Sequence, residues 1–119
     1  MSELQNNHPY LAKLRELIKK LPEGQEKEAW GHPTFRAGKK LFAIFGDYEG
    51  KPSLSIKSTP AEQAGLTERP EYYMPPYVAN AGWVGVRIQK VKWKEVEALL
   101  VKGYRLVALK RMLKALDGE

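Results

Sequence analysis

The sequence predicts an α+β fold, in which a single antiparallel sheet of about five strands carries an N-terminal helix and two C-terminal helices. Apolar side chains recur at helical spacing in residues 10–21 and again in residues 93–116, whereas they alternate with polar ones between residues 26 and 57. The connections within the alternating region are too short for crossover helices, so its strands are expected to be antiparallel. A chain of 119 residues has the usual size of one domain, and we assign residues 1–119 to one.

The first helix is predicted from Pro9 to Leu21. Asn7 is a suitable N-terminal cap, and proline is tolerated in a first helical turn. Leucine and isoleucine recur every three or four positions up to Leu21, which predicts one buried face. Pro22 and Gly24 end the helix, because proline drives the residue before it out of helical geometry and glycine breaks a helix.

Four strands joined by tight turns are predicted next, and a fifth follows later in the chain. Their apolar side chains fall at every second position, which places them on one face of the sheet. Alternation assigns Phe42 and Trp83 to the core on this basis. The expected strands are residues 26–30, 34–36, 40–45, 54–57 and 82–88.

A short helix is expected between the fourth and fifth strands. Thr59 is suited to cap it, with Glu62 placed to complete a capping box, and Gly65 limits its length. The segment 72–77 contains adjacent prolines, which lack the N–H donors that a central strand needs. We expect this segment to be an ordered loop with exposed aromatic edges.

Two C-terminal helices are predicted, at residues 93–102 and 104–116, with Gly103 between them. In the second, Arg105 falls within the apolar arc, where an unpaired guanidinium would be costly. A structural ion pair is the first interpretation of Arg105, and an anion-binding role is the second.

Composition excludes several classes of protein. The chain has no cysteine, so it forms neither disulfides nor thiolate metal sites. Its N-terminus lacks the apolar run of a signal peptide, and no stretch is long and apolar enough to span a membrane, so we expect a cytoplasmic protein without membrane contact. The two histidines, His8 and His32, belong to no short-spaced ligand cluster. We therefore predict no metal and no cofactor.

No motif indicates catalysis. The sequence lacks a Gly-x-Ser-x-Gly turn and a phosphate-binding glycine loop. Ser53 and Ser55 lie near the end of the fourth strand, where His32 could fold towards them, but serines near turns are usually turn formers. We predict a binding protein rather than an enzyme.

The charge distribution favours a polyanionic partner. The net charge is +6, and it is concentrated in residues 36–57, with five basic and two acidic side chains, and in residues 87–119, with nine and four. A solubilising surface is the alternative explanation. The candidates for phosphate contact are Arg36, Lys39, Lys40, Lys57 and Arg87 on the sheet, and Lys110, Arg111 and Lys114 on the last helix. Trp30 and His32 are candidates for stacking on a base or lining a pocket.

The order of several motifs resembles the MmcQ/YjbR family of small bacterial proteins. The strongest match is Trp-Gly-His-Pro-Thr-Phe-Arg at residues 30–36, and further matches are Leu-Ser-Ile-Lys at 54–57, Gly-Trp-Val at 82–84 and Tyr-Arg-Leu-Val-Ala at 104–108. The family usually has serine where this chain has Gly103. The resemblance implies an α+β fold of the bacterial frataxin-like (CyaY-like) type, and the description "DNA-binding protein" that the family commonly carries. Charge and resemblance together predict a non-sequence-specific DNA-binding protein that contacts phosphates.

Two other functions remain open. One is a protein-interaction adaptor, which would use the Tyr72–Tyr77 loop or a sheet edge. The other is a small-molecule binder with a pocket between Trp30, His32, Lys40 and Arg105. A monomer is expected in each case, although a protein partner remains possible.

Overall fold

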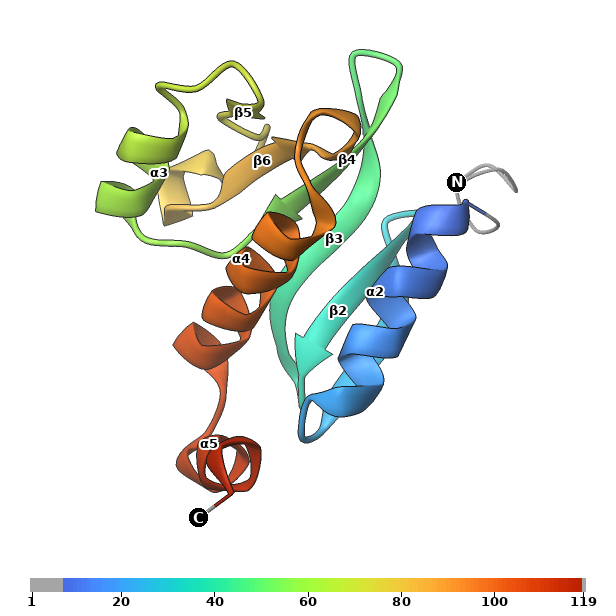
Figure 1. The fold of residues 1–119 in the computed structure, drawn as a ribbon, viewed down its shortest axis with the longest axis vertical. Coiled ribbons are helices and arrows are strands. Elements are labelled where there is room, and N and C mark those ends of the chain that lie inside the picture. The colour runs from blue at the N-terminus through green and yellow to red at the C-terminus, as the bar shows by residue number, and fades with distance from the viewer. Residues whose placement is uncertain (1–7, 119) are drawn as a thin grey trace.

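A computed structural model describes residues 8–118, which form one six-stranded antiparallel sheet and four α-helices (Figure 1). The predicted α+β class is confirmed, with one strand more than the five expected. The strands, in the spatial order β1-β2-β3-β4-β6-β5, are β1 (Gly24–Ala29), β2 (His32–Ala37), β3 (Lys40–Tyr48), β4 (Lys51–Ile56), β6 (Val84–Arg87) and β5 (Tyr72–Tyr73). The helices are α2 (Pro9–Lys20), α3 (Pro60–Leu66), α4 (Trp93–Val107) and α5 (Lys110–Asp117), with short 3₁₀ turns η1 (Ala79–Ala81) and η2 (Ile88–Lys90).

Helix α2 begins at Pro9, and His8 caps it. The Nδ1 atom of His8 accepts a hydrogen bond from the Tyr10 N–H at 3.1 Å. The cap expected at Asn7 lies outside the described residues. The helix ends at Lys20, and Leu21 is already extended, as the proline after it predicts.

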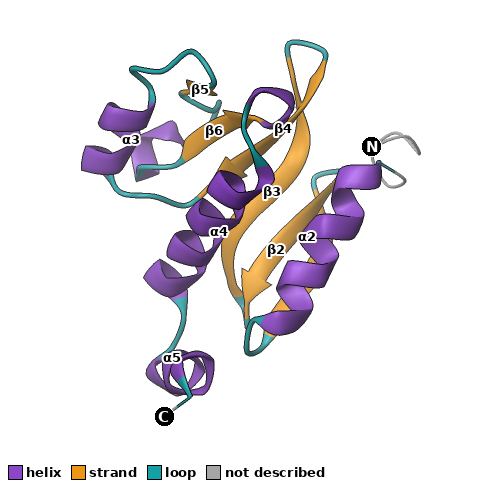
Figure 2. Cartoon of the chain, in the orientation of Figure 1, coloured by secondary structure: helices purple, strands orange, loops and turns teal. Residues whose placement is uncertain are grey.

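Helices α2 and α4 cover one face of the sheet (Figure 2). The apolar residues of both helices meet the inward-facing side chains of β2, β3, β4 and β6 in one core. Phe42 is fully buried in this core, as predicted. Trp83 is also buried but lies outside the core, because Val84 and Val86 are the residues of its strand that face it. The other face of the sheet carries neither of these helices.

Helix α3 has the predicted cap. The Thr59 side chain accepts a hydrogen bond from the Glu62 N–H at 3.2 Å. The reciprocal half of a capping box is absent in this part of the chain, because the Glu62 carboxylate accepts from the Ser58 hydroxyl and pairs with Lys102 instead, both at 3.2 Å.

The expected helix break at Gly103 is wrong. Gly103 lies inside α4, and the two C-terminal helices separate at Ala108 and Leu109, whose backbones are extended. A Cβ atom on Gly103 would lie 2.9 Å from the Lys57 carbonyl oxygen. The glycine therefore lets α4 approach the sheet closely, and this packing offsets the roughly 1 kcal/mol that glycine costs a helix interior.

The expectation of a loop throughout residues 72–77 is wrong for its first two residues. Tyr72 and Tyr73 form the edge strand β5, paired with Val86 and Gly85 of β6. Both tyrosines precede the two prolines and retain their N–H groups, so they can pair with a neighbouring strand. Tyr72 and Tyr73 are also buried, whereas Met74 and Tyr77 are exposed.

The ionised carboxylate of Glu95 is expected to stabilise the fold at neutral pH and to lose this effect in acid. The Tyr72 hydroxyl donates to it, Arg69 pairs with it at 2.8 Å, and these two contacts lower the pKa of Glu95. A lowered folded-state pKa gives stability that is present above the ordinary carboxyl pKa and is lost as pH falls through the folded one.

The Glu95→Gln variant should therefore be less stable than the native protein at neutral pH, and the difference should shrink as the pH falls below the ordinary carboxyl pKa and through the lowered one. Urea unfolding across this range measures it. Glu97→Gln, on the same helix, is the control and should show no such convergence. A Glu95→Gln difference that persists undiminished at low pH would contradict the assigned contacts.

Candidate binding site on the open face of the sheet

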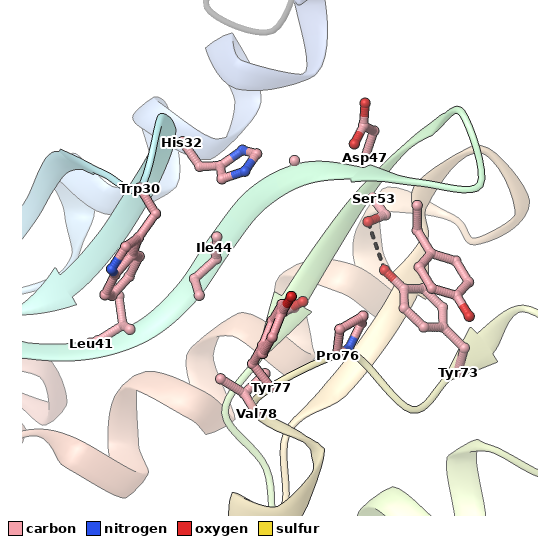
Figure 3. A pocket seen from close by; sticks show the side chains of 13 residues that line it. Trp30, His32, Leu41, Ile44, Asp47, Ser53, Tyr73, Pro76, Tyr77 and Val78 are labelled. Carbon is pink, nitrogen blue, oxygen red and sulfur yellow. Dashed lines mark hydrogen bonds between the residues drawn. The ribbon is translucent and has the colours of Figure 1, made fainter. Parts of the chain in front are cut away.

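The face of the sheet opposite α2 and α4 holds a cavity of about 640 Å³. Small residues make its floor, because Gly46 pairs with Ser53 across β3 and β4, and Ser55 pairs with Gly85 across β4 and β6. The floor has room for a ligand because these side chains are short or absent. The cavity is lined by Trp30, His32, Leu41, Ile44, Gly46, Asp47, Tyr48, Ser53, Ser55, Tyr73, Pro76, Tyr77 and Val78 (Figure 3).

Two exposed aromatic side chains stand at the rim. Trp30 comes from the turn between β1 and β2 and is 73% exposed, and Tyr77 comes from the loop before η1 and is fully exposed. Both residues have left-handed backbone angles, with φ of 54° and 69°. This region is unfavourable for bulky L-residues, so the chain holds both rings at the cavity against their local preference.

His32 closes one side of the cavity above Gly46. A Cβ atom on Gly46 would lie 3.1 Å from His32 Nδ1, so a larger residue here would require the imidazole to shift by a few tenths of an ångström. Within residues 8–118, this buried Nδ1 atom has no hydrogen-bond partner. A buried polar atom without a partner is costly, and a ligand edge would be one way to satisfy it.

Tyr73 forms the opposite wall. Its ring covers Gly85 and stacks on Tyr48 with 3.7 Å between centroids, and its hydroxyl lies 2.7 Å from the Ser53 Oγ (Figure 3). Burial raises the pKa of Tyr73. Arg87 lies 5.2 Å from both tyrosine ring centroids and pairs with Glu49 at 2.8 Å. Arg87 therefore stabilises the tyrosine wall of the cavity, and we do not include it among the residues that contact phosphate.

Some of the predicted basic residues form ion pairs with acidic side chains, and others do not. Arg111 pairs with Glu23 at 2.7 Å, and Arg105 pairs with Asp117 at 2.9 Å. The contacts therefore favour a structural ion pair as the role of Arg105. Because the helix break lies at Ala108, Arg105 belongs to α4 and is exposed, instead of lying in the apolar arc of the last helix.

Arg36 is the one arginine among residues 8–118 that has no carboxylate partner. It is half-buried on β2 and pairs in register with Leu41, which lines the cavity. Its Nε atom is buried without a partner in the described chain, and its NH1 atom reaches only the Lys39 carbonyl at 3.4 Å. Within the described chain, no carboxylate therefore competes with an anion for this half-buried guanidinium.

The five lysines predicted to contact phosphate lie in two places. Lys57 follows Ser53 and Ser55 at alternate positions, so strand alternation places it on the open face, where its Nζ lies 3.5 Å from the Ala81 carbonyl. The other four lie where α5 packs against the turn between β2 and β3 (Figure 1), and we call this region the basic end. The basic end consists of the exposed lysines Lys39, Lys40, Lys110 and Lys114.

The structure brings Trp30 and His32 into the cavity, whereas Lys40 and Arg105, the other members of the expected pocket, do not line it. Sequence reasoning missed Tyr48, and it assigned the segment that holds Tyr73 and Tyr77 to an adaptor surface rather than to this pocket. The alternation of Ser53 and Ser55 with apolar neighbours was a signal for a polar, uncovered face. Nothing local indicated that the tyrosines, from two separate segments, would surround it.

Within the described residues, no three histidine, cysteine or acidic side chains converge in a way that would hold a metal ion. Likewise, no helix there is long and apolar enough to cross a membrane.

Fold and site together define an α+β protein with one helix-covered sheet face and one open face that has an aromatic rim. The family model YjbR matches residues 19–106, and the chain belongs to the YjbR family. This confirms the resemblance drawn from the motifs.

Two solved structures share the fold. Deinococcus radiodurans protein DR2400, with the family-model domain DUF419, is 22% identical with a TM-score of 0.75, over 90% of this chain and 87% of that one. A Pseudomonas syringae protein solved by structural genomics is 19% identical with a TM-score of 0.66, over 80% of this chain and 96% of that one. No curated protein matches this chain.

Proposed function

We propose that this protein binds nucleic acid, without catalysis, through phosphate contacts on the open sheet face and the basic end. The proposal rests on the observation that Arg36, unlike the other arginines, has no carboxylate partner among the described residues. Five of the six arginines in the described chain are committed to carboxylates, whereas Arg36 is left beside the cavity with an unsatisfied Nε. Guanidinium is the group best suited to phosphate, since it donates several hydrogen bonds in one plane.

The lysines support this proposal by their position. Lys57 lies on the same sheet face as Arg36, Lys39 lies in the turn after β2, and Lys40 is the first residue of β3. None of these three lysines has an acidic partner within residues 8–118. Several cations without acidic partners favour a polyanion over a single anion.

The adaptor function is less well supported. Of the four residues that would form its apolar patch, Tyr72 and Tyr73 are buried in the edge strand and its packing. Met74 and Tyr77 alone leave little apolar surface for a partner.

Fluorescence anisotropy with labelled single- and double-stranded DNA, at low and near-physiological salt, tests the proposal. We expect micromolar binding that weakens with salt, and an Arg36→Ala/Lys40→Ala variant whose slope of log K against log salt falls by about 1 per removed contact. Lys92→Ala/Lys94→Ala, with the same charge change at the far end of α4, is the matched control (Figure 1). Absence of binding at low salt, or equal effects of the two variants, would overturn the proposal.

A further inference from the structure

The cavity on the open face has features that phosphate binding does not require. Of the four non-glycine residues with left-handed backbones in the described chain, two are Trp30 and Tyr77, and both line this cavity. Such a backbone costs about 1–2 kcal/mol for an L-residue. Neither ring repays that cost by packing in the core, because both are exposed. Their position is explained if they contact a ligand.

The shape of the site suits a flat ring. Its volume of about 640 Å³ is typical of small-ligand pockets. Aromatic side chains stand at its edges, and the floor at Gly46, Ser53 and Ser55 carries no bulky group. Aromatic faces favour stacking with another planar π-system, and such stacking tolerates any base.

Polar groups around the cavity select a heterocycle over a hydrocarbon ring. Among the lining residues, Ser55 supplies a hydroxyl, and His32 has the buried Nδ1 without a described partner. A hydroxyl can donate to a ring carbonyl or accept from a ring N–H, and an imidazole nitrogen donates or accepts according to its tautomer. A ring that bears both donors and acceptors at its edge matches this set.

The cations next to the cavity select a ring attached to phosphate. Arg36 is the register partner of the lining residue Leu41, and Lys57 lies two positions beyond the lining residue Ser55 on the same face. A phosphate joined to a ring in the cavity is therefore within the reach of long basic side chains.

We infer that the cavity binds one unpaired nucleobase against Trp30 and Tyr77, with its phosphate towards Arg36 and Lys57. This rests on the proposed nucleic-acid binding and narrows it to single strands or free nucleotides. A base inside a duplex cannot enter, because both of its faces are stacked and its pairing edge is occupied.

Three labelled probes test the inference: a strand of about twelve thymidines, an abasic strand of equal length, and the corresponding duplex. We expect the thymidine strand to bind at least about tenfold more tightly than the abasic strand. Trp30→Gly/Tyr77→Gly should reduce the thymidine strand to the affinity of the abasic one. Glycine is the replacement because it accepts the left-handed backbone of both positions, so the fold is retained.

Met74→Ala/Leu106→Ala removes two other exposed apolar side chains and is the control, which should bind like the native protein. A titration with thymidine monophosphate, in which NMR follows the Trp30 indole and the His32 imidazole, distinguishes a site for free nucleotides from a site for bases within a strand. Tighter binding of the monophosphate than of the strand would assign the cavity to free nucleotides, and the reverse would assign it to single strands. Both results support a nucleobase site.

The two proposals fail separately. Equal, salt-sensitive affinity for the thymidine and abasic strands, without shifts from the monophosphate, overturns the nucleobase site and leaves phosphate binding intact. Shifts from the monophosphate without binding of any strand overturn nucleic-acid binding and retain the cavity as a nucleotide site. No response to any probe overturns both.

Discussion

Replacing Tyr104 by alanine should lower the free energy of unfolding by about 3–5 kcal/mol, as for other large aromatic-to-alanine changes in cores. Tyr104 is fully buried, and its ring meets Phe42 edge to face at 5.8 Å between centroids. Its hydroxyl donates to the Pro22 carbonyl at 2.6 Å. One side chain therefore joins α4 to the sheet and to the loop between α2 and β1, and alanine would leave a cavity at this junction.

Urea unfolding of Tyr104→Ala and Tyr104→Phe separates the two contributions of this residue. Phenylalanine keeps the ring and removes only the hydrogen bond, so its loss should be about 1 kcal/mol. A Tyr104→Phe loss as large as that of Tyr104→Ala would mean that the hydroxyl, rather than the packing, holds the junction together.

Gly85→Ala should cost about 1–3 kcal/mol, the range for overpacking a closely packed site. The new Cβ atom would lie 2.3 Å from the Tyr73 ring. That ring is held by the stack on Tyr48, by the Ser53 hydroxyl and by Arg87, so it cannot move aside without losing these contacts. Alanine at this position is expected to expel Tyr73 and to remove one wall of the cavity.

A double-mutant cycle checks this mechanism. Once Tyr73→Ala has removed the ring, Gly85→Ala has nothing left to displace, so the double variant should be about as stable as Tyr73→Ala alone. Urea unfolding of the four proteins measures the coupling. Additive losses would show that alanine at position 85 disturbs something other than Tyr73.

The candidate site was only partly predictable from the sequence. The motif around Trp30 and His32 marked two lining residues, and charge marked Arg36. Whether an arginine is neutralised depends on an acidic partner that can be distant in the chain. Glu23 and Arg111, for example, are 88 positions apart. Pattern and composition carry no information about such pairs, and the tyrosines of the cavity wall also meet only through the sheet.

Local physical chemistry, which a sequence carries by itself, determined the elements of this protein. Period-two alternation specified the meander from β1 to β4, and Pro9, Pro22 and Thr59 marked helix ends because their effects act within a turn of chain. Tertiary contacts determined the rest. Gly103 continues α4 because β4 lies against it, and the open sheet face exists because α2 and α4 both pack on the opposite side. Alternation identifies which residues share a face, but only packing between distant segments determines which face is covered.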